Sequence, residues 1–209
     1  MIRPPRMQAL LWTAALLWMG CASATARAPR PSPARVRFET EAGAFVVELD
    51  ARAPVTVANF LRYVDGGFYD GGRFHRTVTT QPDNQPDKTV KIEVIQAGAD
   101  PAREAESFSP IALERTSATG LHHRDGTISM ARDGPDTATS DFFVCVGDQP
   151  ELDFGGRRNP DGQGFAAFGR VVEGMDVVKR IHVAPAQGQS LTPAIRIVRA
   201  RRLDEGGAR

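Results

Sequence analysis

The stretch GTISMARDGPDTATSDFFVCV, residues 126–146, decides the fold class of this chain. Two short apolar segments, residues 126–130 and 142–146, flank a polar stretch that contains Gly134 and Pro135. Short apolar runs separated by turn-forming residues are typical of β-strands joined by loops. The segment therefore predicts two neighbouring strands of a β-rich domain.

The same pattern extends in both directions. Residues 35–40 and 44–49 flank a turn and predict a β-hairpin. Further strands are expected at residues 72–78, 90–96, 166–172 and 194–203.

Helical patterns are fewer. One helix is expected to begin at Pro54 and to stop at residues 65–67, and a second to run from residue 174 or 175 to His182. Residues 79–90 are polar and contain prolines, which indicates a surface loop. Many short strands and two helices predict a closed or nearly closed antiparallel barrel that is capped by helices.

The N-terminus has the pattern of an export signal. Arg3 and Arg6 precede an apolar run, residues 9–19, which is too short to span a bilayer but has the length of a signal-peptide core. Small residues at 22–26 offer A-x-A cleavage sites, whereas Gly20-Cys21 resembles a bacterial lipidation site. We expect a protein exported to the periplasm or cell envelope, either freely secreted or anchored in the membrane by a lipid on Cys21.

These patterns divide the chain. Residues 1–24 are expected to form the signal peptide, which would end at Gly20 in a lipoprotein. Residues 25–34 read as a proline-rich tether, residues 35–203 as the folded domain and residues 204–209 as a C-terminal tail.

Composition excludes several classes of function. A formal net charge of +1 argues against nucleic-acid binding through phosphate neutralisation, and two cysteines exclude a disulfide scaffold or a multi-cysteine zinc site. Cys145 lies in an apolar strand pattern and is expected to be buried. The adjacent His122 and His123 are expected at a turn or on the surface, since neighbours on an extended chain point to opposite faces. Neither a cofactor nor a metal is expected.

Five short blocks occur in order along the chain. They are FHR at 74–76, QAG at 96–98, SMA at 129–131, SDFF at 140–143 and FGRVVEGM at 168–175. Together they resemble the cyclophilins, which are peptidyl-prolyl cis-trans isomerases, and the resemblance covers about residues 35–203. It implies a mainly-β fold, an eight-stranded antiparallel β-barrel capped by two α-helices, and an activity that needs no cofactor.

The resemblance also implies roles for individual residues. Arg76 would donate a hydrogen bond to the prolyl nitrogen and Gln96 would support it. The substrate-binding residues would be Phe74, Val94, Ala131, Arg132, Phe143, Leu152 and Phe165, with Phe143, Val94 and Leu152 forming the floor of a proline pocket. Taken singly, Arg76 could instead be a rim arginine paired to a carboxylate, Phe143 and Leu152 plain core residues, and Gln96 a strand-end hydrogen-bonding group.

Some positions depart from the family pattern. Glu93 and Glu151 align with aromatic residues of the family's pocket, Asp141 with a glutamine and Ala97 with a glycine. Two glutamates in the pocket would weaken the binding of apolar X-Pro peptides and of cyclosporin, and would favour basic residues beside the proline.

The resulting hypothesis is a monomeric isomerase that acts on proline-containing unfolded or extended polypeptides among exported proteins. Its partners would include no nucleic acid, and the membrane only through a lipid anchor. Two alternatives remain open at this point: a cyclophilin-like peptide-binding or chaperone module with weak or no isomerase activity, and a structural barrel domain in a lipoprotein complex.

Overall fold

The computed structural model describes residues 33–203. The expected signal peptide, the lipidation candidate Cys21, most of the tether and the C-terminal tail lie outside the described residues.

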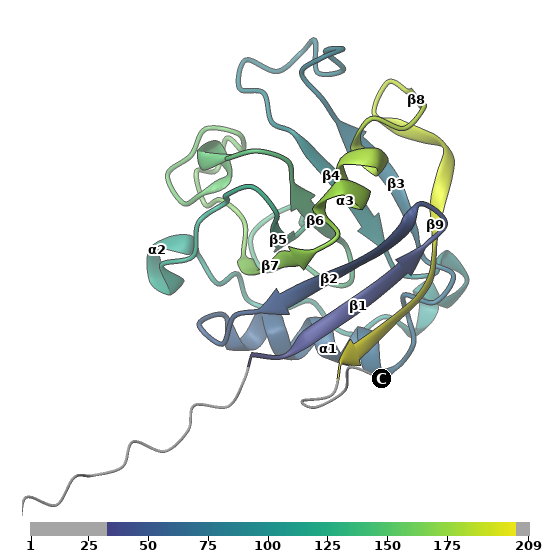
Figure 1. Cartoon of the computed structure of the whole chain (residues 1–209). Coiled ribbons are helices and arrows are strands. Elements are labelled where there is room, and N and C mark those ends of the chain that lie inside the picture. Colours follow the sequence, from purple (N-terminus) through teal and green to yellow (C-terminus); the bar gives the residue numbers. More distant parts are fainter. Residues whose placement is uncertain (1–32, 204–209) are drawn as a thin grey trace, which may run out of the picture. The chain divides into compact units, whose positions relative to one another are not determined.

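Eight antiparallel strands close into a barrel (Figure 1). Around the ring they follow the order β1 (Arg35–Thr40), β2 (Gly43–Leu49), β7 (Ala167–Glu173), β5 (Thr127–Met130), β6 (Phe142–Cys145), β4 (Val94–Gly98), β3 (Arg73–Val78) and β9 (Ser190–Leu203). Pairing between β9 and β1 closes the ring. A two-residue strand, β8 (Ala186–Gln187), forms a hairpin with the start of β9. The predicted eight-stranded barrel is confirmed, with β8 as an addition.

Two longer helices pack against this barrel, as predicted. Helix α1 (Pro54–Asp65) contacts β9, and α3 (Met175–His182) contacts β2, β3 and β4. The first turn of α1 has no capping side chain of its own. Instead the carboxylate of Glu114 accepts hydrogen bonds from the Val55 and Thr56 amides at 3.2 and 2.7 Å. It thereby satisfies free N–H groups and complements the helix dipole.

Shorter helical segments were not predicted. A single turn, α2, covers Thr116–Thr119, and 3-10 turns cover Pro101–Glu106 (η1) and Pro150–Leu152 (η2). The sequence rules are insensitive to such segments because one turn contains too few residues to show a helical period.

The barrel interior is an aromatic core. Phe38, Phe60, Phe142 and Phe168 are all fully buried, and the rings of Phe38 and Phe142 lie 5.3 Å apart. A second, smaller apolar cluster contains Phe143. Because successive side chains on a strand point to opposite faces, Phe142 enters the barrel core while its neighbour Phe143 faces the outside.

The segment between β3 and β4 differs in part from its prediction. Residues 79–93 form a loop, so β4 begins at Val94 rather than at residue 90. The loop is not wholly superficial, because Gln85 is buried and its amide bonds both the carbonyl and the N–H of Ile92. At Ile92 this side-chain bonding takes the place of strand pairing.

Candidate active site

A cavity of about 400 Å³ lies outside the barrel, over the second apolar cluster. The structure brings together at this cavity all of the predicted site residues except Phe74. They are Arg76, Val94, Gln96, Ala131, Arg132, Phe143, Leu152 and Phe165.

The prediction that Phe74 binds substrate is wrong. Its side chain is fully buried in the barrel, and its ring lies 6.0 Å from that of Phe142. Simple alternation would also turn Arg76 inward, but the strand register shifts between Phe74 and Arg76. A bulge of this kind redirects the side chains that follow it, and here it directs Arg76 to the cavity.

Two glutamines hold the guanidinium of Arg76. Its Nη1 donates to Oε1 of Gln96 at 2.9 Å, and Gln96 is its cross-strand partner on β4. Its Nε and Nη2 both donate to Oε1 of Gln189, at 2.8 and 2.6 Å. Within residues 33–203 Arg76 forms no ion pair with a carboxylate, so it is not the carboxylate-paired rim arginine of the alternative interpretation.

The charge of Arg76 is therefore not neutralised by a neighbour. Burial lowers the pKa of Arg76 from its ordinary value, yet an arginine remains protonated at any physiological pH. A half-buried cation with neutral hydrogen-bond acceptors is well suited to interact with electron density on a bound ligand.

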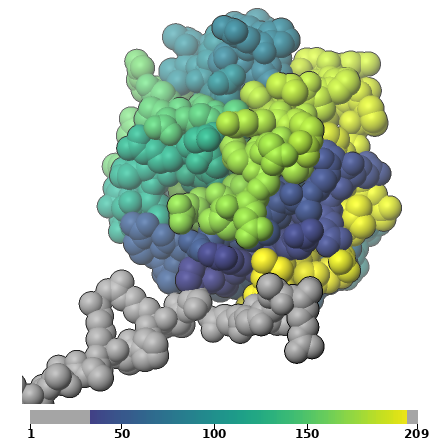
Figure 2. Space-filling model, viewed as in Figure 1, coloured from purple at the N-terminus to yellow at the C-terminus, as the bar shows by residue number. Residues whose placement is uncertain are grey.

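Gln189 was missed by sequence reasoning. It lies in the turn between β8 and β9, and its Nε2 donates to the carbonyl of Asn84 at 3.0 Å in the loop of residues 79–93. Figure 2 shows this loop and the β8 segment side by side at the top of the molecule. A glutamine 113 residues from Arg76 has no local pattern that could have identified it.

The floor of the cavity is apolar. Phe143, Val94 and Leu152 are each no more than 4% exposed. The ring of Phe165 meets the ring of Phe143 edge-on at 5.3 Å and forms an adjoining wall. Such a surface is suited to a small apolar ring such as that of proline.

Arg132 supports one wall of the cavity through its side chain. Its guanidinium is almost completely buried and pairs with Asp161 at 2.8 Å. It also donates to the carbonyl of Gly164 and lies 5.0 Å from the centre of the Phe165 ring. Arg132 thus holds Phe165 and the loop of residues 159–164 in place.

Neither Glu93 nor Glu151 lines the cavity. Glu93 accepts a hydrogen bond from the hydroxyl of Thr80 at 2.9 Å, and Glu151 pairs with Arg157 at 2.9 Å on the surface. The expected preference for basic residues and the expected weakening of apolar binding both depended on glutamates in the pocket. The structure removes that basis.

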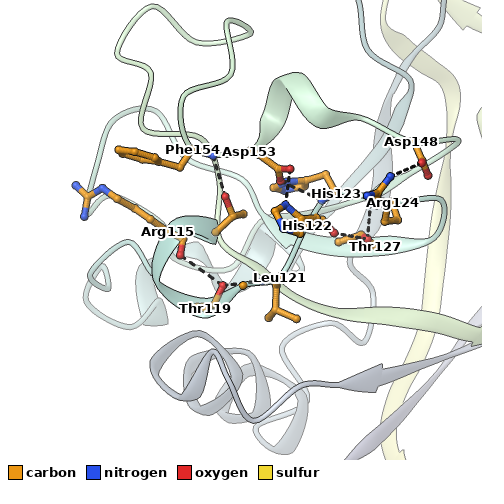
Figure 3. A network of polar contacts seen from close by, with 12 residues as sticks. Arg115, Thr119, Leu121, His122, His123, Arg124, Thr127, Asp148, Asp153 and Phe154 are labelled. Atoms are coloured by element: carbon orange, nitrogen blue, oxygen red, sulfur yellow. Dashed lines mark hydrogen bonds and ion pairs between the residues drawn. The ribbon is translucent and has the colours of Figure 1, made fainter.

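His123 is buried, which contradicts its predicted turn or surface position, whereas His122 is exposed. The two side chains do not diverge, because residues 121–125 form no strand. Both contact Asp153, His122 at 2.9 Å and His123 at 2.7 Å, as Figure 3 shows. Burial raises the pKa of Asp153, but the hydrogen bonds from His123 and His122 outweigh this effect and hold its pKa below the ordinary value.

The other ring nitrogen of His123 contacts the hydroxyl of Ser129 at 3.0 Å. A serine, a histidine and an aspartate thus form a chain, but Ser129 is fully buried and no substrate can reach it. The His123 ring instead stacks on Phe143, with ring centres 5.9 Å apart and planes inclined by 15°. The hydrogen-bonded group of Ser129, His123 and Asp153 therefore supports the floor of the cavity.

Cys145 is fully buried, as predicted, and burial raises the pKa of its thiol well above the ordinary value. In the described part of the chain, no three His, Cys, Asp or Glu side chains are grouped so that they could hold a metal ion. None of the helices within residues 33–203 has the length and apolar character needed to cross a bilayer.

Comparisons with known proteins agree with this geometry. A family model described as cyclophilin type peptidyl-prolyl cis-trans isomerase/CLD matches residues 35–202. Peptidyl-prolyl cis-trans isomerase cyp18 of Streptomyces antibioticus is 38% identical over 70% of this chain and 81% of its own length. Peptidyl-prolyl cis-trans isomerase B of Escherichia coli strain K12 is 34% identical over 70% of this chain and 82% of its own length.

Solved structures show the same fold. The crystal structure of a Cryptosporidium parvum cyclophilin type peptidyl-prolyl cis-trans isomerase in the presence of the dipeptide Ala-Pro aligns with a TM-score of 0.64. The alignment covers 82% of this chain and 99% of that one, at 22% sequence identity.

Proposed function

Because the chain belongs to the cyclophilin-type peptidyl-prolyl cis-trans isomerases, it catalyses X-Pro isomerisation, and we propose that Arg76 is its catalytic residue. One observation carries this assignment. The Arg76 guanidinium borders the same cavity as the apolar floor formed by Phe143, and it is held by neutral glutamines rather than by a carboxylate.

The reaction needs no bond to be made or broken. Twisting an X-Pro bond costs about 20 kcal/mol because it disrupts amide resonance. In the twisted state the prolyl nitrogen becomes pyramidal and regains a lone pair, so a hydrogen-bond donor stabilises that state more than either planar isomer. Arg76 supplies this donor from a fixed position, since Gln96 and Gln189 restrict its rotation.

The remaining residues would hold the substrate. Phe143, Val94 and Leu152 would bind the proline ring while the preceding carbonyl rotates. Gln96 would support both Arg76 and the substrate backbone, and Ala131, Arg132 and Phe165 would line the peptide groove. The alternative of a chaperone module without catalysis drew on Glu93 and Glu151 in place of the family's aromatic residues, and it is not favoured, because neither glutamate lines the cavity whereas Arg76 and Phe143 do.

We further propose that the clients are exported proteins. This proposal is supported by the signal-peptide pattern of the sequence, with residues 1–24 as the signal and residues 35–203 as the isomerase domain. The substrates would be proline-containing unfolded or extended polypeptides, and the enzyme would act as a monomer in the periplasm or cell envelope. Lipid attachment to Cys21 would be its only link to the membrane.

A comparison of arginine variants tests the catalytic assignment. We expect Arg76→Ala to lower kcat/KM for a short X-Pro peptide by about a hundredfold, the usual loss when one transition-state donor is removed. Arg170→Ala is the control, because Arg170 is exposed on β7 and does not line the cavity. Equal activities of Arg76→Ala and the unmodified protein would refute the assignment.

Location is tested separately. Fractionation of cells that express the full chain would place the protein in the envelope or in the cytosol, and a lipid label would report on Cys21. Retention in the cytosol would refute the export proposal without affecting the assignment of Arg76.

A further inference from the structure

A second arginine lines the cavity. Arg158 lies in the segment between η2 and β7, and its Nη1 donates to Oε1 of Gln85 at 2.8 Å and to the carbonyl of Val90 at 2.6 Å. Both acceptors belong to the loop of residues 79–93, and both are neutral. Two loops from distant parts of the sequence therefore meet to place one guanidinium beside the proposed proline pocket.

Arg158 has no carboxylate partner among residues 33–203. Most arginines of the described part are paired to carboxylates, including the adjacent Arg157, which pairs with Glu151 at 2.9 Å. Within residues 33–203 Arg158 forms no ion pair, and its Nε and Nη2 have no hydrogen-bond acceptor. These donors are available to a ligand.

The surroundings of Arg158 are positively charged. Burial, and then the charge of nearby Arg76, lower the pKa of Arg158, although both arginines remain charged. Lys88 lines the same cavity and forms no ion pair among the described residues. An anion placed here would be attracted by Arg158 and Lys88, and it would offset the repulsion between the two guanidinium groups.

The acidic residues of the cavity lie on another element. Asp133 and Asp141 come from the segment between β5 and β6. Burial raises the pKa of Asp141, and the charge of Asp133 adds to this rise. Asp141 accepts a hydrogen bond from Gln96 at 3.3 Å. Neither aspartate pairs with Arg158 or Lys88 in the described structure, so they do not neutralise the basic wall.

Gln85 gives this wall a fixed geometry. It is almost fully buried, and its Nε2 donates to the carbonyls of Thr79 and Ile92 at 3.0 and 2.8 Å. Its Oε1 accepts from the Ile92 amide at 3.2 Å as well as from Arg158. A fully bonded, buried amide therefore orients the guanidinium before any ligand arrives, which lowers the entropic cost of binding.

We propose that Arg158, with Lys88 lining the same cavity, forms an anion-binding subsite that makes this isomerase prefer peptides with an acidic side chain next to the proline. The guanidinium would form charge-assisted, two-point hydrogen bonds with a carboxylate. The same chemistry would accept a phosphoserine. The proposal rests on the cavity being the substrate site, as proposed above.

The test compares peptides that differ only beside the proline. Glu, Gln, Lys or phosphoserine is placed directly before or directly after proline, and kcat/KM is measured for each peptide. For the unmodified protein we expect Glu to exceed Gln by about tenfold at one of the two positions, as for a hydrogen bond to a charged partner. The preference should weaken at high salt, since it is electrostatic. Faster turnover of phosphoserine than Glu would identify phosphate as the preferred anion.

Variants then assign the preference to Arg158. Arg158→Met should bring the Glu-to-Gln ratio close to one, and Arg158→Lys should retain part of it. Arg157→Met is the matched control, because Arg157 is adjacent, exposed and outside the cavity. A ratio near one in the unmodified protein, or an unchanged ratio in Arg158→Met, would overturn the proposal.

Binding measurements separate this proposal from the assignment of Arg76. Peptide affinities measured by calorimetry give the Glu-to-Gln ratio even in a variant with no turnover. In Arg76→Ala, we expect kcat/KM to fall about a hundredfold for every peptide while the affinity ratio persists. If Arg158→Met is inactive, its affinity ratio still decides the proposal.

Discussion

Arg76 and Gln189 are joined by two hydrogen bonds to a single amide oxygen, at 2.8 Å from Nε and 2.6 Å from Nη2, although 113 residues separate them in sequence. A neutral amide orients the guanidinium without neutralising its charge. The position of Arg76 thus depends on the β8–β9 turn. Asn84 links this turn by hydrogen bonds to the loop of residues 79–93.

Gln189→Glu tests whether this neutrality matters. A carboxylate at the same place would form a two-point ion pair with Arg76 and compete with the prolyl nitrogen for its donors. We expect kcat/KM to fall about tenfold, which corresponds to roughly 1.4 kcal/mol in the barrier. Gln187→Glu on the exposed strand β8 is the control for added charge. Activity at the level of the unmodified protein would show that the neutrality of the Arg76 partner does not matter for catalysis.

His123→Ala tests the support beneath Phe143. The change removes the ring that bonds Oδ1 of Asp153 and that stacks on Phe143, and it leaves the buried hydroxyl of Ser129 without its histidine partner. We expect the free energy of unfolding, measured in urea, to fall by about 2–3 kcal/mol. His122→Ala removes an exposed histidine from the same carboxylate and should cost no more than about 0.5 kcal/mol. Similar losses for both variants would contradict the role given to His123.

Asp141 makes the stability depend on pH. Burial raises the pKa of Asp141, so the folded state binds its proton more tightly than the unfolded state does. Ionisation therefore disfavours folding, and the contribution of this group to stability falls as pH rises through and above its ordinary value of 3.8. We expect Asp141→Asn to be more stable than the unmodified protein at neutral pH, with a difference that disappears in acid. Unfolding curves at several pH values check this, and a variant that is less stable at neutral pH would contradict it.

Gly174→Ala tests the backbone conformation and close packing at the residue that precedes α3. Gly174 has a φ of +78°, and a Cβ there would lie 2.5 Å from the carbonyl oxygen of Ala44. Gly188 has a similar φ of +59° but nothing within 4 Å of such a Cβ. We expect Gly188→Ala to cost about 1 kcal/mol from backbone strain alone, and Gly174→Ala about 2–3 kcal/mol more because backbone must move. Equal losses of stability for the two variants in thermal unfolding would show that the β1–β2 hairpin, which carries Ala44, can move without a cost in free energy.

Much of the fold could be predicted because its signals are local. The apolar segments around Phe142 and the proline at the start of α1 are recognised within a few residues of sequence, and both predictions are confirmed. Prediction failed where a side chain took over the backbone groups of an expected strand: Gln85 bonds both the carbonyl and the N–H of Ile92, and β4 begins only at Val94. His123 was misplaced for a related reason, since its burial depends on Asp153 from another loop.

The prediction of the site residues was only partly correct. Short motifs identified Arg76 and Phe143. The alternation of side chains along a strand could not show that a bulge lies between Phe74 and Arg76, so that Phe74 points into the barrel and Arg76 to the cavity. Alignment also placed Glu93 and Glu151 in the pocket, whereas hydrogen bonds to Thr80 and Arg157 hold them elsewhere.

The order of apolar runs and turn residues in this chain was enough to predict a closed antiparallel barrel, because strand formation and turn chemistry act over a few residues. The charge state around the proposed substrate cavity was decided only by tertiary structure. Arg76 and Arg158 line this cavity, and Gln189 and Gln85, which accept hydrogen bonds from them, come from other segments of the chain, so only the folded structure determines which acceptor each guanidinium meets. Contacts of that kind depend on distance in space, for which separation along the sequence is no guide.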